Sequence, residues 1–319
     1  EIKVNKNGFG ALPIQRISHE DAGELLKMAY NAGINFFDTA RFYTDSETKI
    51  GEALGDVREN IYIATKTAPQ NSDLNTSLNN LKTDYIDIYQ FHNPSFCPKP
   101  GDGTGLYEAM LEAKSQGKIR HIGITNHRLN VANEAIESGL YETLQFPFNY
   151  LATEKEHELV EVCRSKNMGF IAMKALSGGL ITNSKAAYAY QAEYDNVLPI
   201  WGVQRKSELE EFISYIDNPP VMDDEIRAVI EKDKKELAGN FCRGCGYCVP
   251  TCPAHIEINN CARMSLLLRR SPSELQLTEA VQAKMKKIED CIHCGQCSAH
   301  CPYGLDTPTL LAENYKDYK

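Results

Sequence analysis

Two cysteine runs in the last third of the chain have the residue type and spacing to bind metal. The first, CRGCGYCVPTCP, extends from Cys242 to Pro253, and the second, CIHCGQCSAHCP, extends from Cys291 to Pro302. Both read C-x-x-C-x-x-C-x-x-x-C-P, a spacing at which neighbouring thiolates converge on one centre. The runs hold eight of the eleven cysteines. This pattern favours metal over disulfides, and it predicts a protein of the reducing cytoplasm.

The fourth cysteine of each run indicates how the ligands are shared. The x-x spacing lets three sulfurs of one loop reach three corners of a 4Fe–4S cube, and in two-cluster ferredoxins the fourth cysteine reaches the other cluster. We therefore expect one cluster on Cys242, Cys245, Cys248 and Cys301, and another on Cys291, Cys294, Cys297 and Cys252. The alternative is a pair of structural zinc sites, but zinc ribbons rarely use two identical four-cysteine runs that end in proline.

Four side chains in the first third of the chain could protonate a carbonyl. A phenol has a reference pKa near ~10, which a neighbouring ammonium lowers. A carboxylate beside the ammonium keeps it charged, and an imidazole can donate a hydrogen bond to a carbonyl oxygen. Each group alone could be a helix cap, a packed ring or a surface charge. Together they could protonate a ketone or aldehyde as hydride reaches carbon, and we expect them to be Asp38, Tyr43, Lys66 and His92.

These four residues lie at or just beyond the ends of strand-like runs. Eight β-rich runs alternate with helical segments, at 8–12, 34–40, 61–66, 85–92, 119–126, 143–149, 169–175 and 197–202. Several runs are almost continuously apolar, as in parallel strands covered on both faces. The pattern predicts a closed (β/α)8 barrel, with the four side chains on the face where barrel enzymes carry chemistry. An open doubly wound sheet is the rival fold, but no G-x-G-x-x-G follows an early strand.

The alternation of strands and helices stops at Asn218-Pro219-Pro220. We therefore expect a barrel domain at 1–218 and a mainly helical, cluster-binding domain at 219–319. Its predicted helices are 223–238, 257–270 and 273–289. The formal net charge of −9 gives no electrostatic footprint for nucleic acid. No apolar run approaches the roughly 20 residues of a membrane helix, so no membrane role is expected.

The motifs FFDTARFYTDSETKIGEAL, IATKT, LNNLKTDYIDIYQFHNP and AKSQGKIRHIGITNH resemble those of the aldo-keto reductases over roughly residues 7–215. The resemblance implies an NADPH-dependent (β/α)8 barrel, in which Asp38, Tyr43, Lys66 and His92 form the family's catalytic tetrad. Residues 241–305 resemble a bacterial dicluster ferredoxin. The fusion of the two is similar to the ferredoxin-tailed branch of the family, which is found mainly in anaerobes.

The same resemblance implies a cofactor pocket that departs from the family's pattern in two places. Where the family stacks a tyrosine on the nicotinamide, this chain has Met173. In the loop that grips the cofactor's 2′-phosphate and adenine, Glu208 and Phe212 replace the usual glutamine and asparagine, while Arg205 and Lys206 remain able to bind phosphate. The expected cofactor-binding residues are Thr125, Asn126, Gln145, Met173, Lys174, Leu176, Gly202, Gln204, Arg205 and Glu208.

Three functions fit these motifs. The first is NADPH-linked reduction of a small carbonyl, or oxidation of the alcohol, with Tyr43 as general acid/base and two clusters that are structural or sense redox state. In the second, ferredoxin or another redox protein feeds electrons through the clusters to a flavin or directly to a barrel-bound substrate. The third is a non-catalytic electron-transfer subunit, which the intact set of four catalytic groups argues against.

Overall fold

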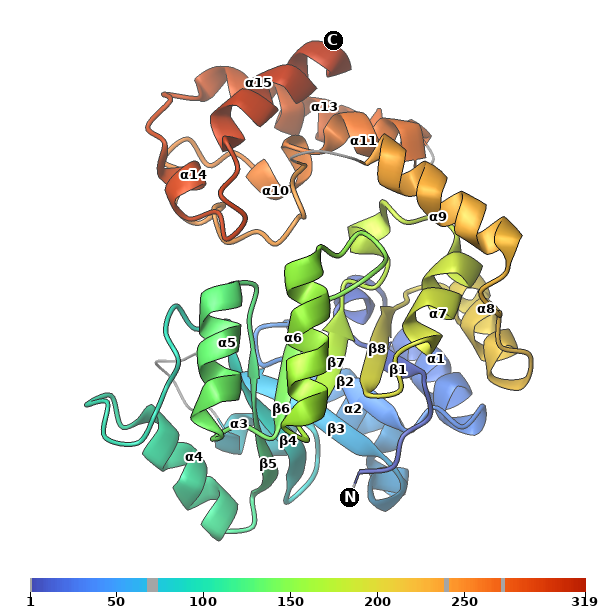
Figure 1. The fold of residues 1–319 in the computed structure, drawn as a ribbon, viewed down its shortest axis with the longest axis vertical. Helices are drawn as coiled ribbons and strands as arrows, with labels where there is room; N and C mark the ends of the chain where they lie inside the picture. Colours follow the sequence, from blue (N-terminus) through green and yellow to red (C-terminus); the bar gives the residue numbers. More distant parts are fainter. Residues whose placement is uncertain (1, 68–73, 238–240, 271–272) are drawn as a thin grey trace. The chain divides into compact units, whose positions relative to one another are not determined.

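The computed structural model describes residues 2–67, 74–237, 241–270 and 273–319 (Figure 1). By its contacts the chain forms two compact units. The barrel unit comprises Glu1–Ala175 and Lys185–Met222, and the cysteine unit comprises Leu176–Ser184 and Asp223–Lys319. The division after Met222 lies close to the expected boundary at 218. The segment Leu176–Ser184 had been expected in the first domain, yet by its contacts it belongs to the cysteine unit.

The predicted barrel is confirmed. Parallel strands pair in chain order and close when β8 pairs with β1 (Figure 1). Each strand lies within its predicted run or extends one residue beyond it. Their bounds are β1 Gly8–Gly10, β2 Phe36–Asp38, β3 Tyr62–Thr67, β4 Ile86–His92, β5 Ile119–Thr125, β6 Thr143–Pro147, β7 Gly169–Met173 and β8 Val197–Gly202.

Helices follow the strands, and some of them begin at a residue whose side chain accepts a hydrogen bond from a free backbone N–H group. Ser18 accepts a hydrogen bond from Asp21 N at 3.0 Å at the start of the first helix, and Thr153 forms a capping box with Glu156. The bounds in this part of the chain are α1 His19–Asn31, α2 Ser46–Leu54, α3 Leu74–Asn80, α4 Leu106–Ser115, α5 Leu129–Ser138, α6 Glu154–Ser165, α7 Ser184–Ala192 and α8 Lys206–Asp217.

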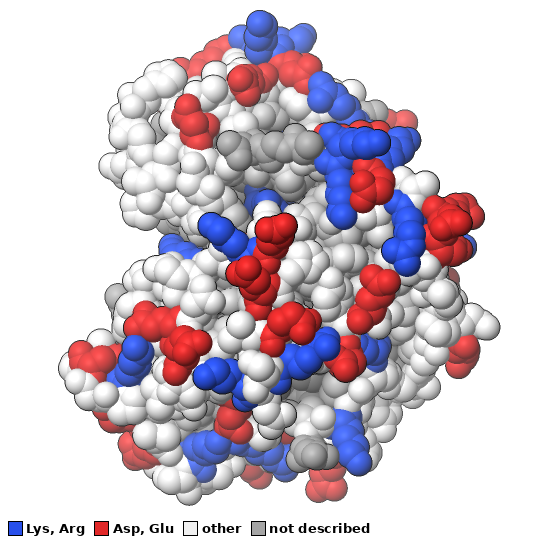
Figure 2. Space-filling view, in the orientation of Figure 1, with Lys and Arg blue, Asp and Glu red and all other residues white. Residues whose placement is uncertain are grey.

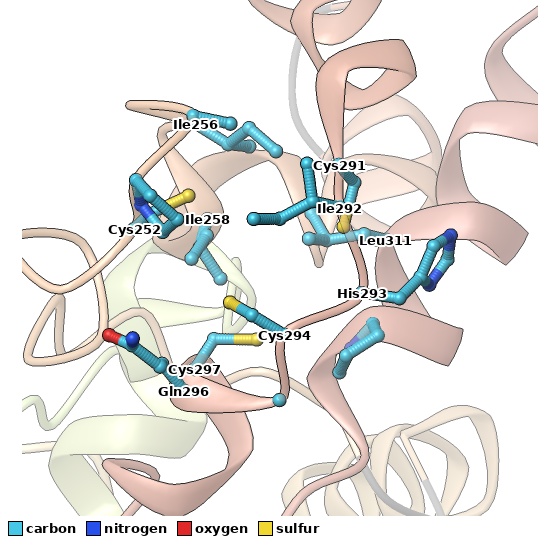
Figure 3. Close-up of a pocket in the computed structure, with 14 residues that line it drawn as sticks. Cys252, Ile256, Ile258, Cys291, Ile292, His293, Cys294, Gln296, Cys297 and Leu311 are labelled. Carbon is cyan, nitrogen blue, oxygen red and sulfur yellow. The ribbon is translucent and has the colours of Figure 1, made fainter.

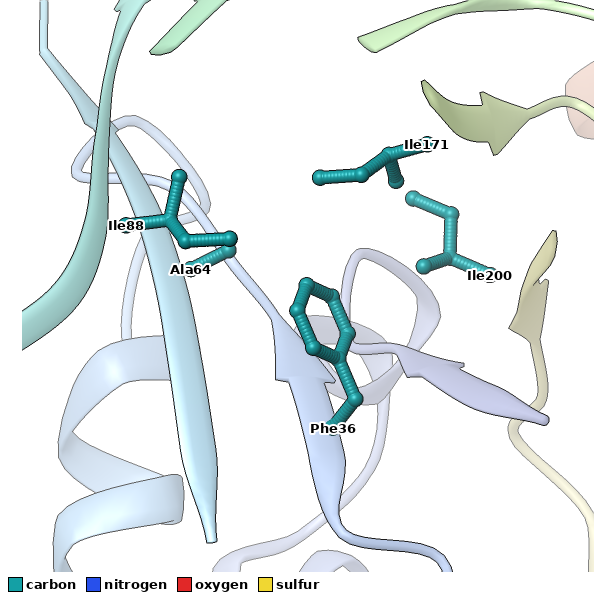
Figure 4. Packing of buried hydrophobic residues seen from close by; sticks show 5 residues of the cluster. All are labelled: Phe36, Ala64, Ile88, Ile171 and Ile200. Carbon is teal, nitrogen blue, oxygen red and sulfur yellow. The ribbon is translucent and has the colours of Figure 1, made fainter. Parts of the chain in front are cut away.

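One layer of apolar side chains packs inside the barrel. It contains Phe36, Ala64, Ile88, Ile171 and Ile200, contributed by five different strands (Figure 4). Because side chains alternate between the two faces of a strand, the residues two positions further along must also point inward. The packed layer therefore sets which residues reach the carboxyl end of the barrel.

The cysteine unit is mainly helical, as predicted. Its helices are α9 Asp224–Glu236, α10 Ile258–Cys261, α11 Met264–Arg270, α12 Ser273–Gln276, α13 Glu279–Lys286, the 3-10 turn η4 Lys287–Asp290, α14 Gln296–Ala299 and α15 Thr307–Tyr318. Residue 238, the predicted end of the first helix, lies outside the described residues.

Two helices predicted as continuous are broken. The 257–270 segment turns at Ala262 and Arg263, between α10 and α11. The 273–289 segment restarts at Thr278, whose hydroxyl accepts a hydrogen bond from Val281 N at 3.4 Å. A threonine at this position favours a new helix start over continuation because its side chain competes for backbone N–H groups. The helical periodicity alone did not show either break.

Charged side chains of both signs are mixed over the face that Figure 2 shows, with no single-sign patch on it. None of the helices within the described ranges is both long enough and apolar enough to span a bilayer.

Candidate functional site

Three of the predicted catalytic residues lie an even number of positions beyond a residue of the packed layer on the same strand. Asp38 is two residues beyond Phe36 on β2, and Lys66 is two beyond Ala64 on β3. His92 is four residues beyond Ile88 at the end of β4. The alternation of side chains therefore directs all three into the carboxyl end of the barrel.

Lys66 and Asp38 form a buried pair. Lys66 Nζ lies 2.7 Å from Asp38 Oδ1 and 2.6 Å from Oδ2, and it also donates to the carbonyl oxygen of Thr39 at 2.5 Å. Burial raises the pKa of Asp38 and lowers the pKa of Lys66, and the charge of each partner opposes the shift of the other. The lysine is thus held in one place by three acceptors.

Tyr43 is brought to this pair by a tight turn after β2, in which Tyr43 N donates to the carbonyl oxygen of Ala40 at 2.9 Å. Lys66 Nζ lies 5.3 Å from the centroid of the Tyr43 ring. The His92 ring meets the Tyr43 ring edge-on, with centroids 5.9 Å apart. The structure thus brings together all four residues that the sequence singled out as catalytic.

His92 is held in its neutral form. Burial, helped by the nearby Lys66 ammonium, lowers the pKa of His92 to about 3. His92 Nδ1 is buried and has no hydrogen-bond partner within the described residues. A neutral imidazole carries one N–H and one lone pair, so His92 can orient a carbonyl without adding charge to the site.

A chain of amides that the sequence reading did not assign to this role supports Asp38. Gln90 Nε2 donates to Gln145 Oε1 at 2.8 Å, and Gln145 Nε2 lies 3.4 Å from Asp38 Oδ1. Gln90 lies two residues before His92 on β4, so strand periodicity could have identified it as inward-facing. Gln145, expected to contact a nicotinamide, therefore also positions the catalytic carboxylate.

Glu47 is a second supporting residue that the sequence did not reveal. It is buried on α2, accepts a hydrogen bond from Thr65 Oγ1 at 2.7 Å, and adds a negative charge that favours the Lys66 ammonium. Its buried position depends on packing between α2 and β3, which no local pattern indicates.

The residues expected around the nicotinamide are largely engaged with the protein. Asn126 Nδ2 donates to the carbonyl oxygen of Pro94 at 2.9 Å, and Asn126 Oδ1 accepts from the backbone N–H groups of His127 and Arg128. Thr125 is buried, and its Oγ1 accepts from Asn93 N. These contacts make the end of β5 rigid. Met173 packs against the apolar layer of the barrel from the end of β7.

The loop after β8 carries Arg205 and Glu208, which were both expected to contact the cofactor, and their side chains pair with each other. Arg205 Nε and Nη2 donate hydrogen bonds to Glu208 Oε1 at 2.9 and 2.5 Å. Glu208 Oε2 accepts hydrogen bonds from Gln204 N and Arg205 N. Gln204 Oε1 is buried without a hydrogen-bond partner within the described residues. A carboxylate thus holds Arg205, the residue expected to bind the 2′-phosphate.

The single tryptophan is a core residue. Trp201 is stacked on Phe212, with centroids 4.4 Å apart, and on Tyr188 at 6.1 Å. Its Nε1 donates to Asn7 Oδ1 at 2.8 Å. Phe212, which departs from the family's asparagine, therefore belongs to this buried aromatic stack.

One cavity in the cysteine unit brings together the second predicted ligand set. Cys252 of the first run faces the same cavity as Cys291, Cys294 and Cys297 of the second (Figure 3). The rest of the wall is mostly apolar, including Ile256, Ile258, Ile292 and Leu311. The fourth cysteine of the first run thus lies with the other run, as the spacing predicts.

The first predicted set gathers in the same crossed way. The Cys242 sulfur interacts electrostatically with those of Cys245 and Cys301. Cys248 interacts with Cys242 and Cys245, and more weakly with Cys297 of the second run. Gly244 N donates to Cys242 Sγ at 3.4 Å, which is the close backbone approach that a glycine permits. Cys97, Cys163 and Cys261, outside both sets, are buried.

The crossed sharing of these thiols is the arrangement of a two-cluster 4Fe–4S site, in which each run gives three cysteines to one cube and its fourth to the other. Burial raises the pKa of the Cys242 and Cys248 thiols, so buried thiolates here require a positive centre among them.

Comparison with known proteins agrees with this geometry. The family model of the aldo/keto reductase family matches residues 6–189, which is more than half of the chain. The chain belongs to the aldo/keto reductase family. A second model, that of a 4Fe-4S dicluster domain, matches residues 241–306 of this aldo/keto reductase. Both resemblances drawn from the sequence are thereby confirmed.

Curated relatives align with the barrel part of this aldo/keto reductase. L-Galactose dehydrogenase of Arabidopsis thaliana is 28% identical over 205 residues, which cover 57% of this chain and 64% of the plant protein. The methylglyoxal reductase DkgB of Salmonella typhi is 38% identical over 124 residues, 35% of this chain and 45% of the relative. The chain thus spans less than two thirds of the length of either relative.

Solved structures of the family share the fold of this aldo/keto reductase. The holo form of AKR11C1 from Bacillus halodurans superposes with a TM-score of 0.63 at 21% identity, covering 73% of this chain and 93% of that one. An aldo-keto reductase of Klebsiella pneumoniae in complex with NADPH gives a TM-score of 0.60 at 20% identity, covering 72% and 90%.

Proposed function

We propose that this aldo/keto reductase reduces a small carbonyl compound with NADPH, or oxidises the alcohol, and carries two 4Fe–4S clusters. The observation that carries the proposal is the convergence of Tyr43, Lys66 and His92 at the carboxyl end of the barrel. A phenol beside a buried ammonium and a neutral imidazole is a proton donor suited to a carbonyl oxygen.

Each of the four groups has one task. Tyr43 gives its proton to the carbonyl oxygen, and Lys66 stabilises the resulting phenolate. Asp38 holds the ammonium at 2.6 and 2.7 Å and keeps it aimed at the ring. His92 stays neutral and orients the substrate oxygen toward Tyr43.

NADPH, when bound, supplies the hydride. Thr125, Asn126 and Gln145 would contact the nicotinamide end, and Met173, Lys174 and Leu176 would flank it. Gly202, Gln204, Arg205 and Glu208 would lie along the phosphate and adenine end. The Klebsiella relative in complex with NADPH supports this choice of cofactor. The Arg205–Glu208 pair predicts a weaker hold on the 2′-phosphate than a free arginine would give.

The proposed substrate is a small molecule with an apolar part. Leu12, Phe42 and Phe96 are exposed large apolar side chains, and they follow β1, β2 and β4 respectively. The loops after barrel strands form the substrate-binding face of such enzymes. The relatives named as a methylglyoxal reductase and a galactose dehydrogenase act on small oxygenated compounds, in keeping with this class.

The two clusters, when bound, supply one-electron transfer. A specific observation supports a second candidate function, in which a ferredoxin or another redox protein exchanges electrons with the chain. Cys294 is exposed and Ile292 is 68% exposed, so the edge of the second ligand set reaches the surface. An accessible edge is what a docking redox protein requires.

Protein purified anaerobically tests the proposal and separates the two functions. Iron, sulfide and flavin are measured first, and NADPH is then added with and without a panel of small aldehydes and ketones. The proposal expects about eight irons per chain, no flavin, and NADPH consumption only with a carbonyl present. Iron-free protein reconstituted only by zinc, or no turnover with any carbonyl, would contradict it. Prompt bleaching of the cluster absorbance by NADPH alone would favour the ferredoxin-linked function.

A further inference from the structure

Arg263 is a largely buried cation, and two of its donor nitrogens have no acceptor within the described part of the chain. It lies in the turn between α10 and α11, and its Nε and Nη1 are buried without a hydrogen-bond partner. Guanidinium groups stay charged in proteins, and buried polar groups are normally paired. An arginine left in this state indicates a partner that is absent from the protein atoms.

The backbone of the first cysteine run packs directly on this guanidinium. A Cβ atom placed on Gly244 would lie 2.8 Å from both Cζ and Nη1 of Arg263. Gly178, in the Leu176–Ser184 segment of the same unit, approaches equally closely, since its Cβ would lie 2.7 Å from Nη1. Both glycines have positive φ angles, of 66° and 63°. The two glycines therefore allow the cation to lie flat against the loop that carries Cys242 and Cys245.

The charge of Arg263 lies beside the first ligand set. Arg263 interacts electrostatically with the Cys242 sulfur. The residues that line the cavity of the second set include no lysine or arginine among those the structure describes. The first set therefore has a largely buried arginine beside it that the lining of the second set lacks.

We propose that Arg263 is the charge partner of the cluster held by Cys242, Cys245, Cys248 and Cys301, and that it gives this cluster the more positive midpoint potential. Four thiolates around a 4Fe–4S core leave a net negative charge, which grows by one unit on reduction. A buried cation stabilises the more negative state more strongly, because low polarity strengthens the attraction. The unpaired N–H groups can also donate to sulfur.

The potential difference sets an order for electron transfer. With both clusters bound, a low-potential one-electron protein donor would reduce the cluster held by the exposed Cys294 and its partners. The electron would then move to the cluster beside Arg263 and leave the second cluster oxidised again. This inference rests on the proposed binding of two clusters and not on the carbonyl chemistry. Iron and sulfide content of the wild-type protein therefore tests the underlying proposal separately from the role of Arg263.

The test is an anaerobic redox titration of the intact protein, followed by electron paramagnetic resonance, on three proteins. Wild type should show two midpoint potentials. Arg263→Gln removes the charge, and we expect it to shift the more positive midpoint downward and leave the other in place. Arg269→Gln is the matched control, because Arg269 lies only six residues further along the chain, on α11, but is exposed and paired with Asp317 at 2.8 Å. It should leave both midpoints unchanged.

Each possible result of the titration either supports or overturns the role proposed for Arg263. Unchanged midpoints in Arg263→Gln, equal shifts of both, or a shift of the more negative one would overturn the proposal. If Arg263→Gln retains only one cluster, the survivor must have the more negative wild-type midpoint; survival of the other cluster, or loss of both, would also overturn it. Arg263→Lys keeps the charge and should retain both clusters and a midpoint between those of wild type and the glutamine variant.

Discussion

Lys66 Nζ contacts both carboxylate oxygens of Asp38, at 2.7 and 2.6 Å, and both side chains are almost fully buried. A buried pair of this kind adds little net stability relative to apolar residues, but it is costly to break because one charge is then left without a partner. Its place at the end of two barrel strands, beside the Tyr43 ring, indicates that the pair serves catalysis.

Removing one partner of this pair should destabilise the barrel unit. We expect Lys66→Met to lower the free energy of unfolding by about 3–5 kcal/mol, because Asp38 would remain buried without its cation. The double variant Asp38→Asn/Lys66→Met should recover a large part of the loss. Urea unfolding followed by the fluorescence of Trp201, the single tryptophan and a residue of the barrel unit, measures both values. Equal losses in the two variants would contradict an ion pair.

Stability of the barrel unit should depend on pH through His92. Burial lowers its pKa from 6.5 to about 3, so below pH 6.5 the unfolded chain binds a proton that the folded chain does not. Above pH 6.5 His92 therefore costs no stability. As the pH decreases from 6.5 toward 3, the free energy of unfolding falls by up to about 1.4 kcal/mol per pH unit. Unfolding measured between pH 6.5 and 5 tests this before most carboxylates titrate.

His127 provides the comparison for that pH dependence. It is buried, and burial lowers its pKa well below the ordinary value, so it acts in the same direction. We expect His92→Gln to reduce the slope between pH 6.5 and 5 without abolishing it. An unchanged slope would mean that His92 takes up its proton in the folded protein.

The Arg205–Glu208 pair should limit affinity for the 2′-phosphate. Glu208→Gln releases the arginine from an opposing carboxylate, and we expect the KM for NADPH to fall by up to about fivefold, the range of an exposed ion pair. The KM for NADH, which lacks that phosphate, should stay unchanged and serves as the control. A parallel change for both cofactors would place Arg205 away from the phosphate.

The crossed ligand sets can be tested with two cysteines that lie nine residues apart in the chain, the partly exposed Cys252 and the buried Cys261. Cys252→Ala should halve the iron content, because Cys252 faces the cavity of the second run. Cys261→Ala removes a buried thiol outside both sets and should leave the iron content unchanged. In the redox titration, the cluster that remains in Cys252→Ala should be the one with the more positive midpoint. Survival of the other would contradict the crossed assignment.

Much of the barrel and its site was predictable because strand periodicity is local. An apolar run such as that around Phe36 fixes a strand, and the alternation of side chains then directs Asp38 inward. The exchange of the fourth cysteine between the two ligand sets followed from the spacing of the two runs alone. The placement of Leu176–Ser184 with the cysteine unit, and of Arg263 against Gly244, depends on contacts between residues distant in sequence, and no short pattern encodes them.

The most direct test of the account is the Tyr43→Phe variant, assayed anaerobically beside wild type with NADPH and the best carbonyl substrate. Loss of the phenolic proton should lower kcat/KM by at least about 100-fold, while iron content and the Trp201 unfolding transition stay at their wild-type values. Carbonyl reduction at the wild-type rate by Tyr43→Phe would show that the proton comes from another group, and the catalytic assignment would be wrong.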